Sequence, residues 1–171
     1  MSILDFFLFA FIGVAFATDA RKSILPNKLT IVGTGVGFLY HCIVQGWAGL
    51  LFASTGALTG FVVLLLLYLL GALGAGDVKL FAAIGALMGL TYVVQCMIYS
   101  ILFAGAIGLL LLLVRKQVFA TAIKLANWLF SIVAHGDKEA ILGMKHQRNL
   151  KFPFMYAVAP GVVVAWFEVF Q

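Results

Sequence analysis

The chain contains only six acidic residues, and two of them, Asp19 and Asp77, stand at segment edges that can share one membrane boundary. Asp19 closes the first apolar segment and Asp77 opens the fourth, so a fold that crosses a membrane brings both carboxylates to one membrane boundary. Because two carboxylates that share a site do not both ionise at low cost, one keeps a proton, and the pair can act as base and acid on a water molecule. This pairing predicts aspartic-protease chemistry, with Asp19 and Asp77 as the catalytic residues.

The same two residues also have a structural interpretation, in which each carboxylate only caps or anchors a helix end. Asp77 is suited to the amino terminus of a helix. Asp19 lies beside Arg21 and Lys22 and can form an ion pair with them at the membrane interface. The four other acids, which stand at outer segment ends or among lysines, are Asp5, Asp137, Glu139 and Glu168.

The residues that surround Asp77 favour the catalytic interpretation. Gly74 and Gly76 place backbone without side chains directly before the carboxylate, where an extended substrate strand can approach closely. Lys79 either holds an ionised carboxylate or a substrate carbonyl, or anchors the helix end at lipid headgroups. Three other glycine pairs have the small-xxx-small spacing that is typical of close helix packing; they are Gly33 and Gly37, Gly56 and Gly60, and Gly85 and Gly89.

Apolar helices must position these residues. Of the 171 residues 64% are hydrophobic and 10% are charged, whereas soluble domains have about half and about a quarter. One small core cannot hide so many apolar side chains, so lipid must surround much of the surface. We therefore predict an all-α polytopic membrane protein, with residues 1–171 as a single membrane-embedded domain.

Six segments are apolar enough to be transmembrane helices, although the fourth is short for a full crossing. They cover residues 3–18, 30–45, 50–73, 78–90, 92–114 and 152–170. Residues 117–133 carry a polar stripe at helical spacing, which favours an amphipathic helix on the inner face over a seventh span. The region before the first apolar segment has no Lys or Arg, which argues against a cleaved secretory signal.

The positions of the basic residues predict the orientation of the chain. If the amino terminus is outside, the inner loops 20–29, 74–79 and 115–151 contain all 11 Lys and Arg residues. This asymmetry obeys the positive-inside rule. The net charge of +5 therefore reflects membrane topology, with no need of a nucleic-acid partner, and Asp19 and Asp77 both lie on the cytoplasmic side.

Two motifs in this sequence resemble those of a known family, the type IV prepilin peptidases, which are intramembrane aspartic proteases with a G-x-G-D signature. Residues 74–80, Gly-Ala-Gly-Asp-Val-Lys-Leu, are similar to the second aspartate motif of that family. Asp19, followed by Pro26 and Asn27, is similar to the first. Residues 153–161 are similar to a further pattern of the short family members, with Met155 in place of a glycine.

The resemblance implies a function for the whole chain. It assigns the catalytic roles to Asp19 and Asp77, and implies removal of the basic leader from prepilin-like precursors at the cytoplasmic face of the bacterial inner membrane. We expect Asp77, near the positive end of a helix dipole, to be the more readily ionised member and Asp19 to carry the proton. Pro26 and Asn27 are expected to shape the loop after the first span.

The similarity is to short, peptidase-only family members that serve tight-adherence pili. Because the chain begins directly with its first span and lacks a four-cysteine motif, we expect no separate methyltransferase domain. Cys42 and Cys96 either pair or stay isolated thiols, and isolation is favoured. The histidines have no ligand spacing, so we expect no metal or other cofactor. The expected partners are a prepilin-like precursor and membrane lipids; the oligomeric state is not predicted.

Two other classes of protein remain possible on these residues. A small ion- or proton-coupled transporter would use intramembrane acids to bind a proton or cation, but it would place them near the midplane of two related halves, and the sequence has no internal repeat. A non-catalytic scaffold for pilus assembly would not need either aspartate. Leader cleavage therefore separates the peptidase from both alternatives.

Overall fold

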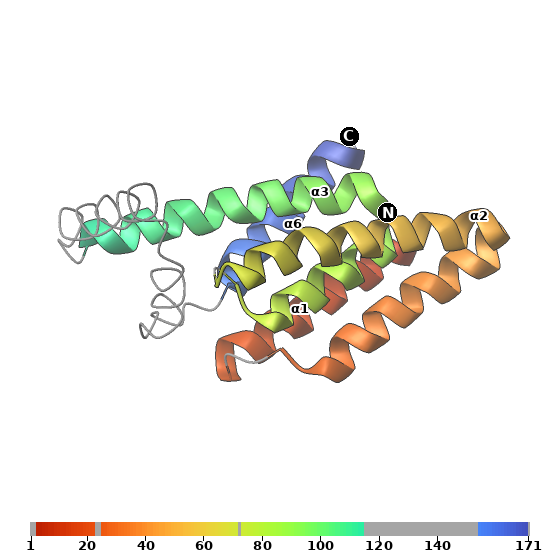
Figure 1. The fold of residues 1–171 in the computed structure, drawn as a ribbon, viewed down its shortest axis with the longest axis horizontal. Helices are drawn as coiled ribbons and strands as arrows, with labels where there is room; N and C mark the ends of the chain where they lie inside the picture. The colour runs from red at the N-terminus through yellow and green to blue at the C-terminus, as the bar shows by residue number, and fades with distance from the viewer. Residues whose placement is uncertain (1–2, 23–24, 72, 115–153, 171) are drawn as a thin grey trace, which may run out of the picture. The chain divides into compact units, whose positions relative to one another are not determined.

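The computed structural model describes residues 3–22, 25–71, 73–114 and 154–170, and these residues form helices and short connections. The helices are α1 (Ile3–Lys22), α2 (Asn27–Leu69), α3 (Ala75–Val114) and α6 (Met155–Phe170), coloured from red to blue in Figure 1. The amphipathic helix that we predict over residues 117–133 lies outside the described residues. The described residues up to 104 belong to one compact unit together with 154–170, whereas the part of α3 from residue 105 belongs to another. The features discussed below belong to the first unit.

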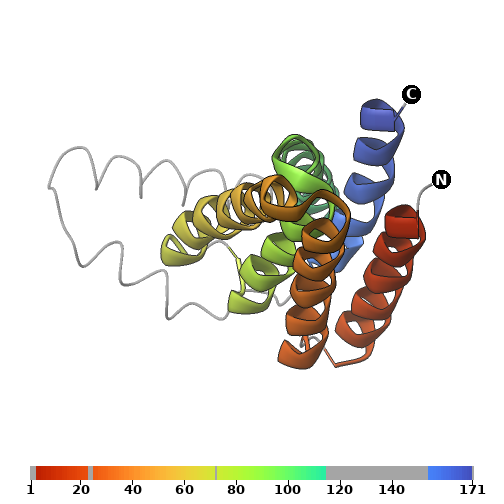
Figure 2. The same cartoon turned by 90° about the vertical axis from the view of Figure 1, so that its right-hand side faces the viewer.

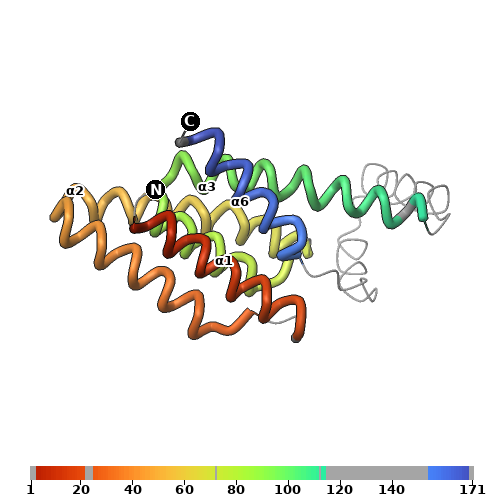
Figure 3. The backbone as a smooth tube through the Cα atoms, turned by 180° about the vertical axis from the view of Figure 1, so that it is seen from behind, coloured from red at the N-terminus to blue at the C-terminus, as the bar shows by residue number. Residues whose placement is uncertain are grey.

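Each of the two long helices changes direction at one glycine. A straight helix as long as α2, with 43 residues, would be about 65 Å long, roughly twice the thickness of a hydrocarbon core of about 30 Å. Gly46, with φ 59° and ψ −131°, divides α2 into two legs, and Gly89, with φ 83° and ψ −179°, divides α3 in the same way. Figures 1 and 3 show both helices folding back at these points.

Contacts close to the bends hold the legs together. Gly49, in the second leg of α2, packs directly on the carbonyl of His41 in the first leg. The Nε2 atom of His41 lies 3.0 Å from the carbonyl oxygen of Leu87, which comes shortly before the bend of α3. The two bends are therefore packed at the same end of the bundle.

Helices α1, α2 and α3 are long and apolar enough to cross a membrane, and α6 is a shorter apolar helix. This finding confirms the prediction of an all-helical chain with apolar spans. The count of six crossings, which takes each leg of α2 and α3 separately, stays a prediction. The boundaries also differ, since α1 continues beyond residue 18 to Lys22, and α2 begins at Asn27 and ends at Leu69. Asp19 thus lies inside a helix.

The first leg of α3 is the centre of the bundle. Its side chains are buried on several faces, and Leu80, Phe81 and Ile84 have no exposed surface. A helix that is apolar all round needs neighbours on all sides. Helix α1 lies against α6 and against the start of α2 (Figure 2). T-shaped contacts of Phe9 with Trp166 and of Phe16 with Tyr156 show that α1 and α6 run antiparallel.

Glycines allow the legs of α2 to approach α3 closely. A Cβ atom at Gly37 would lie 2.6 Å from the backbone of Ala86. Gly56 and Gly85 face each other, and a Cβ atom on either one would collide with the carbonyl oxygen of the other. The predicted packing role of the small-xxx-small glycines is confirmed at these positions.

The bend at Gly46 provides a test of the fold. We expect Gly46→Ala to lower the free energy of unfolding by about 1–3 kcal/mol, because its backbone dihedrals are accessible almost only to glycine. No atom lies within 4 Å of a Cβ built there, so steric crowding does not contribute. Gly35→Ala, in the same helix and with equal space but without positive φ, is the control. Denaturant unfolding in detergent that gave both variants the same stability would contradict this account.

Candidate active site

Asp77 occupies the first turn of α3, where it caps its own helix. Gly71, with φ 77°, turns the chain after α2. The backbone N–H of Gly74 donates to Oδ2 of Asp77 over 3.1 Å, and the N–H of Asp77 donates to the carbonyl oxygen of Gly74 over 3.1 Å. These reciprocal bonds satisfy groups that a helix start leaves unpaired. They fix the position of the carboxylate, and Asp77 is only 9% exposed.

Asp19 occupies the last turns of α1 and is 7% exposed. Its Oδ2 atom accepts a hydrogen bond from the backbone N–H of Met155 over 3.3 Å. Met155 is the first residue of α6, so the carboxylate of Asp19 lies at the amino end of that helix, where the N–H groups carry partial positive charge. Asp19 is therefore held between the end of one helix and the start of another.

The fold brings Asp19 and Asp77 into electrostatic interaction, although they are 58 positions apart. Both are largely removed from solvent. Two acidic groups that interact in such surroundings resist double ionisation, because desolvation and mutual repulsion both disfavour the second charge. The arrangement favours a state in which one of the two carboxyls keeps its proton.

The structure places the other predicted residues around this pair in two groups. Gly74 is exposed beside Asp77, whereas a Cβ atom at Gly76 would lie 3.1 Å from Cβ of Leu25. Gly76 thus lets the chain before α2 pack on the start of α3. Pro26, with φ −65°, precedes α2, and its carbonyl oxygen accepts the N–H of Leu29 over 3.0 Å.

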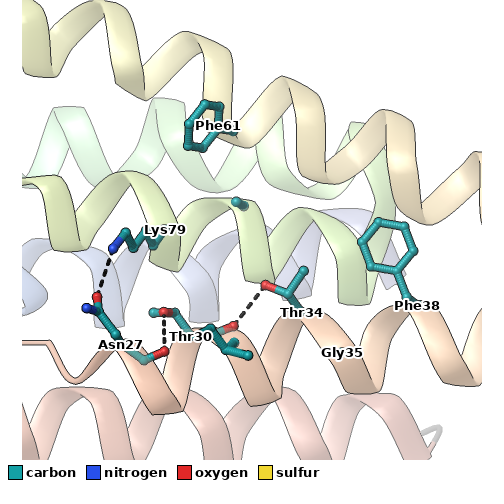
Figure 4. A pocket seen from close by; sticks show the side chains of 9 residues that line it. Asn27, Thr30, Thr34, Gly35, Phe38, Phe61 and Lys79 are labelled. Carbon is teal, nitrogen blue, oxygen red and sulfur yellow. Dashed lines mark hydrogen bonds between the residues drawn. The ribbon is translucent and has the colours of Figure 1, made fainter.

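Asn27 and Lys79 form the second group. The Nζ atom of Lys79 donates to Oδ1 of Asn27 over 2.9 Å, as Figure 4 shows. Positions two apart on a helix point about 200° from each other, so Lys79 and Asp77 lie on opposite sides of α3. This geometry favours a role for Lys79 at the membrane interface over a direct contact with the carboxylate.

Sequence reasoning did not find the backbone donor of Met155 or the contact of Leu25. A backbone amide leaves no trace in residue types, and Met155 is separated from Asp19 by 136 positions. The similarity of residues 153–161 to a family pattern was the available signal for the contact of Met155.

The two cysteines do not form a disulfide, since Cys42 is exposed, Cys96 is buried, and both are free thiols.

Comparison with known proteins finds a family match over most of the chain. Residues 6–113, which include both aspartates, match the model of the "Type IV leader peptidase family". The chain therefore belongs to this family of peptidases, and it is an integral membrane protein, as its long apolar helices indicate.

Several curated proteins named "Prepilin leader peptidase/N-methyltransferase" are similar to this chain. The one from Aeromonas hydrophila is 32% identical over 124 residues, which is 65% of this chain and 42% of that protein. The one from Pectobacterium carotovorum subsp. carotovorum is 32% identical over 133 residues, which is 71% of this chain and 46% of that protein. This chain thus spans less than half the length of these relatives. No solved structure matches.

Proposed function

We propose that this protein is an intramembrane aspartic endopeptidase that removes the basic leader peptide from prepilin-like precursors. The observation that carries this proposal is the interaction of two buried carboxyls, Asp19 and Asp77, within the segment that matches the leader peptidase family. The names of the relatives support the choice of substrate.

In the proposed reaction, the ionised carboxylate takes a proton from water while the water oxygen bonds to the peptide carbonyl carbon. The protonated carboxyl gives its proton to the carbonyl oxygen. The tetrahedral intermediate then collapses and the C–N bond breaks. The leaving nitrogen receives the proton that came from water, and a hydroxyl of the intermediate returns a proton to the carboxylate that had donated one. The products are a new carboxyl group on the leader and a new amino group on the pilin helix.

We retain the proposal that Asp77 is the base and Asp19 the proton carrier. Each carboxyl accepts one backbone N–H, from Gly74 for Asp77 and from Met155 for Asp19. Each carboxyl lies at the amino end of a helix, α3 for Asp77 and α6 for Asp19. We expected a helix dipole only at Asp77, but α6 provides one at Asp19 as well. The dipoles therefore distinguish the two carboxyls little, and the pair is best treated as one coupled unit.

An exposed backbone segment beside Asp77 offers a route for the substrate. Gly74 and Ala75 are exposed, whereas Asp77 is buried next to them. A substrate must be extended at the bond that is cut, and an extended strand can pair with free backbone groups. We propose that the leader–helix boundary of the precursor binds along this segment.

The proposed topology has six crossings with the amino terminus outside and the site at the cytoplasmic face of the bacterial inner membrane. The carboxyl end of α1 and the amino ends of α2, α3 and α6 lie at the site end of the bundle, together with the exposed cations Arg21, Lys28 and Lys79. The positive-inside rule supports this orientation. Residues 1–171 act as one peptidase domain in this proposal.

A cleavage assay with the purified full chain in detergent tests the proposed function. The substrate is a synthetic polypeptide with a basic leader joined to an apolar helix, and the products are identified by mass spectrometry. We expect one cut at the leader–helix boundary and no cut by the Asp19→Asn/Asp77→Asn variant. If the wild-type protein leaves the substrate intact in detergent and in vesicles, the transporter and scaffold alternatives replace the peptidase.

A further inference from the structure

A groove runs along α2 beside the first leg of α3 (Figure 4). It has a volume of about 490 Å³ and lies between the two legs of α2 and the first leg of α3. Its residues on the first leg of α2 extend from Asn27 to Phe38, a distance of about 16 Å at 1.5 Å per residue. Phe61 on the second leg and Ala82 on α3 complete its walls.

The walls of the groove suit a hydrocarbon chain. Thr30 and Thr34 line it, but their hydroxyls donate to backbone carbonyls of their own helix over 3.0 and 2.8 Å. They therefore offer no free hydroxyl proton to a ligand. Gly35 adds space, since no atom lies within 4 Å of a Cβ built there. Ile31 is 69% exposed at the edge. Because these helices are apolar enough to span a membrane, lipid rather than water surrounds the opening.

One end of the groove carries a positive charge. Lys79 is exposed, and its amino group donates to Asn27. An ammonium has three protons, so two remain for a second partner. Both residues lie near helix starts, at the level where lysine side chains reach phosphate groups. The residues that line the groove include no Asp or Glu, so the charge at its end is complementary to an anion.

We propose that this groove binds an anionic glycerophospholipid, with one acyl chain between the legs of α2 and the phosphate at Lys79. The backbone of α3 separates the groove from Asp77, because Lys79 and Asp77 point to opposite sides of that helix. A basic polypeptide leader would meet a like charge at Lys79, which disfavours the substrate as the occupant. The proposal is independent of the proposed peptidase activity.

Photocrosslinking identifies the occupant. A benzophenone amino acid replaces Ile31 in the full chain, which is reconstituted in vesicles of phosphatidylglycerol and phosphatidylcholine, with leader-bearing substrate present in one sample. We expect an adduct with the mass of one phosphatidylglycerol. An adduct with the mass of a second chain or of the substrate would overturn the proposal.

Retained lipid, counted by native mass spectrometry after mild delipidation, tests the two parts of the site separately. We expect Gly35→Phe, which fills the groove, to lose the bound lipid, whereas Gly13→Phe, on α1 with equal open space, retains it.

Lys79→Gln should lower the preference for phosphatidylglycerol over phosphatidylcholine by about fivefold, since one basic residue contributes about 1 kcal/mol at an anionic surface. Lys28→Gln, an exposed cation that does not line the groove, is the matched control. Equal retention by both phenylalanine variants, or equal preference in both glutamine variants, would overturn the proposal.

Discussion

Asp19→Asn and Asp77→Asn are each expected to lower kcat/KM for leader cleavage by about a thousandfold, within the range for loss of a general acid or base. An asparagine side chain nearly matches aspartate in shape but cannot take or give the proton that the reaction transfers. Because both carboxyls are buried and interact, the remaining one has no partner for the shared proton. Initial rates with the leader-bearing substrate provide the measurement.

Asp5→Asn is the control for the two catalytic variants. Asp5 lies on the same helix as Asp19 and is also buried, at 4% exposure. It lies near the opposite end of α1, so the proposed reaction does not involve it. We expect it to keep kcat/KM within a few-fold of wild type after correction for the folded fraction. A fall equal to that of Asp19→Asn would show that loss of any buried acid impairs the protein, and would remove the evidence for a specific pair.

Gly85→Ala is expected to cause the largest loss of stability, about 3 kcal/mol, at the upper end of the range for an overpacked contact. A Cβ atom at Gly85 would collide with the carbonyl oxygen of Gly56, and the backbone of Ala57 would lie 3.0 Å away. Backbone atoms cannot rotate away as a side chain does, so the second leg of α2 must separate from α3. Unfolding in detergent should show the loss directly.

Gly13→Ala is the matched control for this contact. It makes the same chemical change in a helix, but no atom lies within 4 Å of the added methyl group. The intrinsic preference of helices for alanine over glycine should make it neutral or stabilising, by up to about 1 kcal/mol. If Gly85→Ala were as stable as Gly13→Ala, the close contact between α2 and α3 in the structure would be wrong.

Hydropathy was sufficient to predict the helical class of this protein, because apolar composition over long segments leaves few alternatives. It did not predict how the spans are joined. We expected separate segments at 30–45 and 50–73, whereas α2 continues through a one-residue bend at Gly46. A single glycine with positive φ can reverse a helix, but glycines occur throughout this chain, 18 in all, and most have other uses.

The candidate site, like the fold, was only partly predictable from the sequence. The alternation of spans placed Asp19 and Asp77 at one membrane boundary, and the structure has them in interaction. Residues 153–161 resemble a family pattern, but their residue types do not indicate that α6 supplies the N–H of Met155 to Asp19. It also did not indicate that Lys79 donates to Asn27 on the far side of α3. Such contacts depend on helix rotation, which the weak amphipathicity of buried and lipid-facing helices does not specify.

The recognition of the family depended on spaced motifs rather than on composition. The match over residues 6–113 confirms that interpretation. Two short motifs far apart in the chain were informative because a membrane fold brings their aspartates together. Composition alone left a transporter and a non-catalytic scaffold as alternatives.

The double variant Asp19→Asn/Asp77→Asn, compared with both single variants, tests most directly whether the two carboxyls work as one unit. Residues that act together are strongly non-additive in kinetics. We therefore predict that kcat/KM of the double variant is no lower than that of the less active single variant. A double variant whose loss equals the product of the two single losses would show independent roles and would contradict the shared-proton mechanism.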